Sequence, residues 1–295
     1  MKILIATRRP KLWVKFQSDI TGIAESEIDI ETIAPYLYFL GDSEVPALTN
    51  NYVSDRMQDG AKFSYAKYNL TNITANFYLK FTDWYSFRLA KHDFNSYFGR
   101  KGIYRIRTDT HKGIVRYVRV AALPDIEPAE TEAHYALFSL VFENPQGLGK
   151  SLLTSNSLYT YSEEGWQLGM NFPNGVDLKY HYQNVSRFKI YNASDIDIDP
   201  YLQGHQLSVN YKFVGDRLTL RNKSTNTVYT LNYTSKGDDE ILIDGIVTYI
   251  NSSLATDKTN YGFFKLAAKS WNDFEVSEGE LKEITFDFPF LYLPS

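Results

Sequence analysis

The chain has 295 residues, of which 43% are hydrophobic and 22% are charged, and its formal net charge is −4. These values exclude a disordered chain, allow two domains of ordinary size, and give no bulk electrostatic reason to bind nucleic acid or anionic lipid. The absence of cysteine excludes disulfide scaffolds, zinc ribbons, iron–sulfur clusters and thiol catalysis, and it indicates folding in a reducing cytosol.

Aromatic residues make up 16% of the chain, with 23 Tyr and 19 Phe. Their flat rings cover a pleated surface well, so this composition favours mostly β structure with large buried or inter-subunit surfaces. The opening MKILIATRRPKLWVKF lacks the apolar core of a signal peptide, and no stretch is long and apolar enough to span a bilayer. We therefore expect no membrane insertion.

The first segment in chain order, residues 22–57, shows no clear period and contains Pro35, Gly41 and Pro46. An unstructured segment of this length is unusual inside a compact domain. We interpret it as a long arm or hairpin that becomes ordered by packing on another subunit. Its aromatic residues are the expected contacts with a neighbouring subunit: Tyr36, Tyr38 and Phe39.

The next segments predict strands around a single helix. Residues 59–81 alternate and then become an apolar strand. The helix is predicted over 83–99, with Thr82 or Asp83 as N-cap, aromatic residues near helical spacing and Gly99 at its end. A hairpin with its turn at 109–113 follows over 102–123, then an acidic loop over 124–133 and a strand over 134–145.

The hairpin region 100–119 carries seven basic residues, among them Arg105, Arg107 and Arg116, against a single Asp109. Basic side chains interleaved with Tyr104 and Tyr117 could hold single-stranded nucleic acid. Because the whole chain is acidic, we favour a solvated or subunit-facing sheet face, balanced by acidic residues such as those in 125–132. These three arginines are therefore candidate interface residues, and no specific nucleic acid is expected.

A Gly-, Ser- and Asn-rich stretch over 144–157 is the best candidate for a domain boundary. It divides the sequence into an N-terminal domain over 1–150 and a C-terminal domain over 151–295, which begins with a connector over 151–185. Short strands separated by turns predict an antiparallel β-sandwich in the second domain. The expected strands are 187–192, 206–212, 216–221, 227–233, 240–243, 246–250, 261–264 and 281–288.

Three aspartates at alternate positions, Asp195, Asp197 and Asp199, resemble the start of a calcium-binding loop. An EF-hand would need glycine and glutamate where this chain has Pro200 and Gln206. We therefore favour the interpretation that these aspartates lie in a strand-edge loop and face water.

The sequence contains no arrangement of residues that is typical of a catalytic or metal site. The five histidines are scattered, and there is no nucleophile elbow and no phosphate-binding glycine loop. A pair of catalytic carboxylates from distant strands, as in a glycosidase, stays open, but no segment nominates one. We expect no enzymatic activity, no cofactor and no metal.

The order of these features resembles one known family, the distal tail proteins of long-tailed siphophages. In the first half the matching stretches are DWYSFRLAKHDFNSYF, GIYRIRT, RYVRVAALPDIEP and HYALFSLVFENPQGLGKS. In the second half they are FKIYNASDIDIDPYLQG, RLTLRNKSTNTVYTLNY, DEILIDG and ELKEITFDFPFLYL. The resemblance extends from about residue 58 to the end and is weakest over 1–57.

The resemblance implies a mainly β, non-catalytic virion protein that is made in the host cytoplasm and located at the phage tail tip. An α+β N-terminal domain with one helix and a long hairpin arm would form a homo-hexameric ring. This ring would join the tail-tube protein to the tail-associated hub protein. A galectin-like sandwich would follow and dock receptor-binding or baseplate proteins. The alternative is a carbohydrate-binding module that uses Trp166 or Trp271 as a stacking platform.

Overall fold

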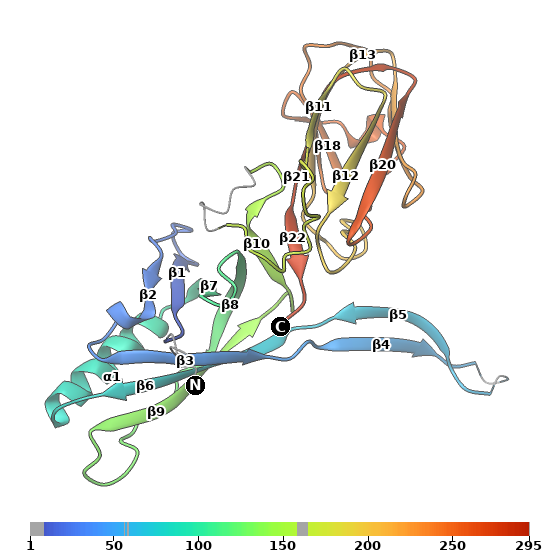
Figure 1. The fold of residues 1–295 in the computed structure, drawn as a ribbon. Coiled ribbons are helices and arrows are strands. Elements are labelled where there is room, and N and C mark those ends of the chain that lie inside the picture. Colours follow the sequence, from blue (N-terminus) through green and yellow to red (C-terminus); the bar gives the residue numbers. More distant parts are fainter. Residues whose placement is uncertain (1–8, 56, 58, 158–164, 295) are drawn as a thin grey trace, which may run out of the picture. The chain divides into compact units, whose positions relative to one another are not determined.

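The computed structural model describes residues 9–55, 57, 59–157 and 165–294. Its backbone packing divides the chain into two units, Met1–Gly149 with Leu293–Ser295 and Lys150–Tyr292. Strands dominate both units, and the described part of the chain contains one α-helix (Figure 1), which confirms the predicted mainly β fold. No helix in that part is long and apolar enough to cross a bilayer.

The first unit is built on one antiparallel sheet with the strand order β2-β1-β7-β8-β9-β6-β3. Its strands are β1 (Leu12–Ser18), β2 (Ile28–Asp29), β3 (Leu37–Glu44), β6 (Thr71–Lys80), β7 (Gly102–Thr108), β8 (Ile114–Ala122) and β9 (Tyr135–Asn144). A short 3-10 helix, η1 (Ile30–Thr32), precedes β3, and β4 (Leu48–Val53) and β5 (Lys62–Tyr68) form a separate two-stranded hairpin.

The helix α1 (Trp84–Phe98) begins and ends where the sequence predicts it. Asp83 accepts a hydrogen bond from the Ser86 backbone N–H at 2.8 Å, and the Ser86 hydroxyl accepts one from the Asp83 backbone N–H at 3.1 Å. This reciprocal capping satisfies N–H groups that have no partner inside the helix. At the other end the Gly99 N–H donates to the Asn95 carbonyl at 2.8 Å.

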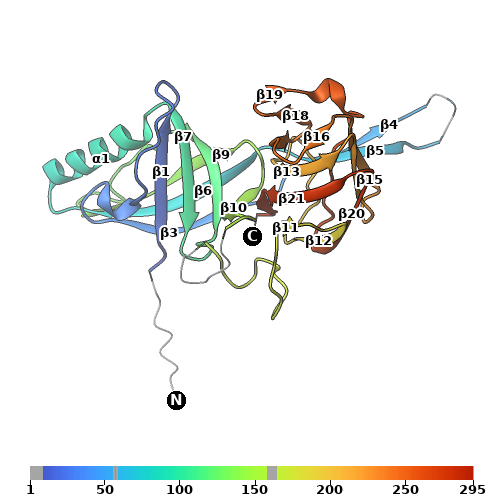
Figure 2. The ribbon, with the colours of Figure 1, turned by 90° about the horizontal axis from the view of Figure 1, so that it is seen from above.

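The core of the first unit lies between α1 and the sheet. Figure 2 shows α1 at one side of the sheet. Phe94 packs on Phe77 of β6 and Phe138 of β9, with ring centroids 5.6 and 5.0 Å apart, and Phe98 packs on Phe142 at 5.8 Å. Alternate residues of β6 and β9 are buried, as the two-residue periodicity predicts. Burial of each such phenylalanine contributes about 1.5–3 kcal/mol.

The second unit contains two antiparallel sheets. The larger sheet has the strand order β11-β21-β13-β17-β18-β19, with β16 paired to β13. The smaller sheet has the strand order β12-β20-β14-β15. The strands of the first are β11 (His181–Gln183), β13 (Ser208–Gly215), β16 (Ser235–Lys236), β17 (Ile241–Asp244), β18 (Val247–Ile250), β19 (Ser253–Leu254) and β21 (Glu280–Asp287). Those of the second are β12 (Arg187–Asn192), β14 (Leu218–Asn222), β15 (Thr227–Leu231) and β20 (Ser270–Ser277). A further pair, β10 (Gly149–Thr154) with β22 (Pro289–Tyr292), and a 3-10 helix, η3 (Thr256–Lys258), complete it.

Aromatic side chains join the two sheets of the second unit. Phe274 of β20 stacks on Phe188 of β12 at 5.2 Å and meets Phe286 of β21 at 5.0 Å. The predicted strand over 261–264 is wrong, because this segment is irregular and Phe264 fills the space between the sheets from a loop. Sequence reasoning missed β20, whose apolar positions are separated by charged residues.

The structure also corrects the interpretation of residues 22–57 as one long arm or hairpin that becomes ordered only on another subunit. This segment contains β2, η1 and β3, and only β4 belongs to a hairpin that leaves the sheet. The alternation in β3 was missed because a β-bulge interrupts its pairing with β6 between Phe39 and Gly41. The division of the chain into a ring-forming domain and a galectin-like domain stays a prediction.

Candidate assembly interface

The β4–β5 hairpin, called the arm below, is the most exposed apolar element of the first unit. It continues β3 and β6 beyond the sheet (Figure 1). Within the described chain, β4 pairs only with β5. Large apolar side chains on it lie in solvent, including Tyr52 at 58% and Phe63 at 54% exposure. A two-stranded hairpin with so little buried surface is marginal in water, and its apolar surface is typical of an interaction site.

The two faces of the arm both carry apolar side chains. Tyr52 and Phe63 lie opposite one another and their rings meet edge-on at 6.0 Å. Tyr65 lies opposite Asn51 and is also exposed. A partner could therefore cover either face, and the sequence signal that could have located the arm is the density of aromatic and β-branched residues in 48–68.

A buried ion pair fixes the root of the arm. The Arg116 Nε of β8 donates to Glu44 Oε2 at 2.6 Å, and only 5% and 1% of the two side chains are exposed. Glu44 is the last residue of β3, and its other carboxylate oxygen accepts from the Thr71 hydroxyl and from Asn144 Nδ2 at 3.1 Å. The arm leaves the sheet after Glu44 and returns at Thr71, so this network sets its position.

The β7–β8 hairpin, whose arginines looked like interface residues, is neutralised within the chain. Glu27 accepts from Arg107 Nη2 at 2.6 Å and from Arg105 Nη2 at 2.8 Å. Arg119 makes a two-pronged pair with Asp19 at 2.7 and 2.9 Å. The balancing acids come from 19–44 and not from 125–132, which corrects that expectation.

The pKa of Glu27 shows how closely these charges are matched. Partial burial by itself would raise the pKa of this carboxyl. The hydrogen bonds and positive charges of Arg107 and Arg105 outweigh burial and hold the pKa below its usual value. With their guanidinium groups so engaged, the three arginines proposed as interface residues stabilise their own unit, and they offer little to nucleic acid.

The three aromatic residues proposed for an interface lie in different environments. Tyr36 is 59% exposed and has a φ of 58°. Tyr38 is half-buried, with its ring stacked on Tyr78 at 6.1 Å and the Arg9 guanidinium 4.2 Å above it. Phe39 is 1% exposed in the core of its own chain. The interpretation of Phe39 as an interface residue is therefore wrong, whereas Tyr36 keeps its surface free.

The three alternating aspartates of the second unit bind protein groups. Asp195 pairs with Lys269 at 2.8 Å, the Asp197 carboxylate accepts from the Ala268 N–H at 2.7 Å, and Asp199 pairs with Lys265 at 2.7 Å. Asp199 is buried instead of facing water, and it also accepts from the backbone N–H groups of Tyr201 and Leu202.

The pKa of Asp199 reflects these bonds: burial raises it, but the lysine and the two N–H groups lower it more. The aspartates hold the loop 265–269 in place and do not converge. In the described ranges no three acidic or histidine side chains are grouped as metal ligands would be.

The two tryptophans considered as sugar platforms also differ. Trp166 is 4% exposed and packs edge-on against Phe172 at 5.2 Å, so it cannot stack on a ligand. Trp271 is partly exposed, but its ring meets the edge of Tyr191 at 5.2 Å. The carbohydrate alternative therefore loses one of its two proposed platforms.

Comparison with known proteins agrees with the phage tail resemblance. Residues 26–144 match the family described as the phage tail protein RIFT-related domain. No curated protein sequence matches the chain.

Three solved structures that resemble the chain are phage proteins or baseplates. The Dit protein of phage SPP1, described as a paradigm of the hub adsorption apparatus in phages that infect Gram-positive bacteria, matches with a TM-score of 0.59. The match has 9% identity and covers 95% of this chain and 99% of that one. Chains of the phage p2 baseplate in its activated conformation match more weakly. With calcium the TM-score is 0.41 (10% identity, 96% and 98% coverage), and with strontium it is 0.39 (11%, 95% and 97%).

The matched range 26–144 begins beside Glu27 and ends at Asn144, so it contains the arm, its buried root, α1 and the β7–β8 hairpin. The shared fold with SPP1 Dit extends over nearly the whole chain. Residues 26–144 therefore match a phage tail protein RIFT-related domain, the chain shares its fold with SPP1 Dit, and its resemblance to the siphophage distal tail proteins is confirmed.

Proposed function

We propose that the protein forms a homo-hexameric ring at the distal end of a siphophage tail. The first unit closes the ring and joins the tail-tube protein to the tail-associated hub protein. The second unit, a galectin-like sandwich, docks receptor-binding or baseplate proteins. The protein is made in the host cytoplasm, becomes part of the virion, and acts through geometry, with no catalysis, cofactor or metal.

The observation that carries this proposal is the arm inside the matched tail domain. Its apolar side chains, such as Tyr52 and Phe63, are exposed to water in the single chain. Removal of one exposed aromatic side chain from water is favourable by roughly 25 cal/mol per Å² of apolar area. In a ring each subunit has a neighbouring copy, and that copy can cover the apolar side chains of the arm. All the arms of the ring would then be removed from water together.

A ring also requires a contact between two different surfaces of each subunit, repeated until the rotation closes. The arm supplies one surface. The exposed Tyr36, at the turn that leads into the edge strand β3, is the part of the originally proposed interface that fits this role. Arg116 acts behind it, because its pair with Glu44 holds the root of the arm, whereas Arg105 and Arg107 hold Glu27 in the segment before β2.

The test is the mass of the purified protein in solution, measured by light scattering, with electron microscopy to show a central channel. We expect particles of about six chains for the unmodified protein. The double variant Tyr52→Ser/Phe63→Ser should remain folded and become a single chain. The matched control is Leu202→Ser, an equally exposed apolar residue (66%) of the second unit, which should leave the ring intact.

Two outcomes would contradict the proposal. One is an unmodified protein that stays single-copy at high concentration and is not incorporated into tails. The other is a double variant that forms rings as well as the unmodified protein does. Thermal unfolding of each variant, followed by circular dichroism, separates loss of assembly from loss of fold.

A further inference from the structure

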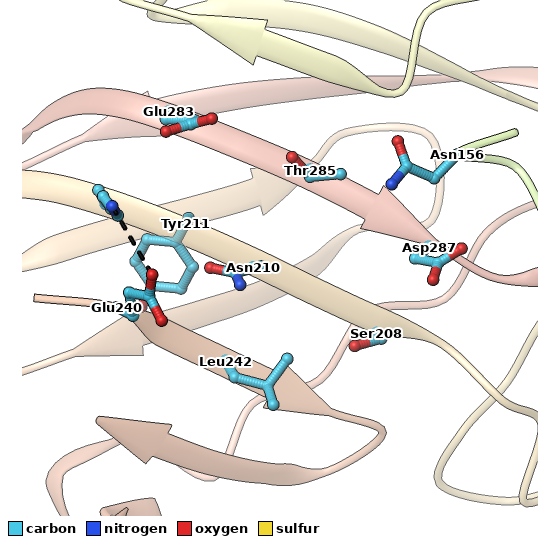
Figure 3. Close-up of a pocket in the computed structure, with 10 residues that line it drawn as sticks. Asn156, Ser208, Asn210, Tyr211, Glu240, Leu242, Glu283, Thr285 and Asp287 are labelled. Carbon is cyan, nitrogen blue, oxygen red and sulfur yellow. Dashed lines mark ion pairs between the residues drawn. The ribbon is translucent and has the colours of Figure 1, made fainter. Parts of the chain in front are cut away.

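The second unit has a polar groove of about 400 Å³ on the outer face of its larger sheet. Its floor is formed by the outward side chains of β21, β13 and β17 (Figure 3). The inward residues of the same strands, such as Val209 and Phe286, are in the core. The groove is thus a rigid sheet surface, lined mainly by hydroxyl, amide and carboxylate groups.

Strand register arranges the groove residues in rows. Ser208 lies opposite Asp287 on one side and Asp244 on the other. Two residues along, Asn210 lies opposite Thr285, and Lys212 follows opposite Glu283. Residues directly opposite share a face of the sheet, so Asp287, Ser208 and Asp244 form one row across three strands.

The two ends of the groove differ in charge compensation. At one end Lys212 Nζ lies 3.8 Å from Glu240. At the other end Asp287 lies beside Ser208 in the lining, and Asp244 lies opposite Ser208 on β17, just outside the lining. Neither aspartate has an ion pair within the described chain. The Asp287 Oδ1 atom is enclosed and has no hydrogen-bond partner there.

Asp287 lines the groove and has no ion pair within the described chain, and a carboxylate in that situation attracts a cationic N–H group from a partner. We propose that this groove docks an extended basic segment of a partner protein, with an arginine or lysine side chain at the Asp287–Ser208–Asp244 row. Arginine fits best, because its five N–H donors can serve Asp287 and Ser208 together. The Asp244 carboxylate adds further attraction from the next strand.

The charge and the aromatic content of the groove favour a basic peptide over a phosphate-rich polymer or a neutral saccharide. Lining residues Glu240, Glu283 and Asp287 outnumber the one lysine, so a phosphate-rich polymer would be repelled. A neutral saccharide would gain from an exposed ring to stack on, but Tyr211, the aromatic residue of the lining, is only 1% exposed. The inference rests on the proposed function only for the assumption that the partner is another tail protein.

The experiment titrates the full-length protein with a fluorescein-labelled peptide of alternating Arg and Gly residues and measures its anisotropy. We expect saturable binding that weakens with added salt, because exposed charges are screened. Asp287→Asn should weaken binding about tenfold, and Asp244→Asn by a smaller factor. The control Asp257→Asn makes the same charge change at an exposed site on η3, outside the groove lining, and should leave the affinity unchanged.

Three results would overturn the inference: no binding of the Arg-Gly peptide, equal affinity of the Asp287→Asn and Asp257→Asn variants, or saturable binding of maltohexaose that depends on Asp287. The last result would identify a saccharide site instead. The peptide titration does not require ring formation, and the proposed function is tested separately by the particle mass in solution. A failed titration would therefore contradict this inference and not the proposed ring. Unfolding curves of both variants confirm that the sandwich is folded.

Discussion

The two hairpins of the first unit place their side chains in opposite situations. The β7–β8 hairpin is rich in arginine, yet Glu27, Glu44 and Asp19 of the same chain neutralise it. The arm has no comparable cluster of arginines, yet large apolar side chains on it, such as Tyr52 and Phe63, are more than half exposed in the described part of the chain. The comparison teaches that a charged pattern marks an interface only if its charges lack partners, whereas exposed apolar surface on a paired strand is the stronger signal.

The sharpest test of this comparison exchanges a residue at the root of the arm. Glu44→Ala should lower the free energy of unfolding by about 3–5 kcal/mol, because Arg116 is left buried without its partner. Urea denaturation of the isolated chain measures it. The double variant Glu44→Ala/Arg116→Met should recover part of the loss. A loss below about 1 kcal/mol for Glu44→Ala would mean that the pair is not buried in solution.

A second test contrasts two aromatic residues of the same segment. Phe39→Ala should cost about 3–5 kcal/mol in the free energy of unfolding, because it empties a site in the core. Tyr52→Ala should cost less than about 1 kcal/mol, because its side chain is exposed in the single chain. Both are measured by denaturation under conditions that keep the protein single-copy. Equal costs would show that the arm is packed on its own unit.

A third test uses the acid dependence of the Glu27 pairs. The pKa of Glu27 is lower in the folded chain than its usual 4.5, so its pairing stabilises the fold above about pH 4.5. This contribution is lost as pH falls from there through the lower pKa of the folded state.

The matching variant is Glu27→Gln, which should lose about 1–3 kcal/mol at neutral pH. The difference between it and the unmodified chain should shrink below pH 4.5, as measured by urea denaturation at several pH values. A difference that is constant with pH would contradict the charge pairing.

The smallest expected effect concerns Tyr36, which is held in the left-handed region at φ 58°. Tyr36→Gly should leave the free energy of unfolding unchanged or raise it by up to about 1 kcal/mol, since glycine adopts this conformation without strain. If its side chain contacts a neighbouring copy, the same variant should weaken the ring measured by light scattering. A ring of unchanged stability would remove Tyr36 from the interface.

Much of the fold could be predicted because its signals are local. The capping residues Asp83 and Ser86 and the spacing of the phenylalanines predict the helix. The alternation of apolar and other residues from Ala136 to Phe142 predicts β9. Predictions failed where long-range packing decides the conformation. Residues 261–264 read as a strand, but Phe264 is apolar because it fills a core from a loop.

The candidate sites were less predictable than the fold, because a site depends on partners that are distant in sequence. Arg116 lies 72 residues from Glu44, and Arg119 lies 100 residues from Asp19. The Asp287–Ser208–Asp244 row joins three strands that no local pattern relates. Sequence reasoning could list the charged residues, but it could not say which of them already have partners.

The sequence by itself determined that the chain is mainly β with one capped helix, because periodicity, capping and aromatic content act over a few residues. Separately, particular stretches such as DWYSFRLAKHDFNSYF resemble the siphophage distal tail proteins. Only the tertiary structure decided which surfaces stay free. It buried Phe39 and Arg116 and exposed Tyr52 and Phe63. It also left one end of the polar groove in the second unit without a basic side chain in its lining. The physical reason is that exposure and charge compensation depend on which strands pair, and strand pairing joins residues far apart in the chain.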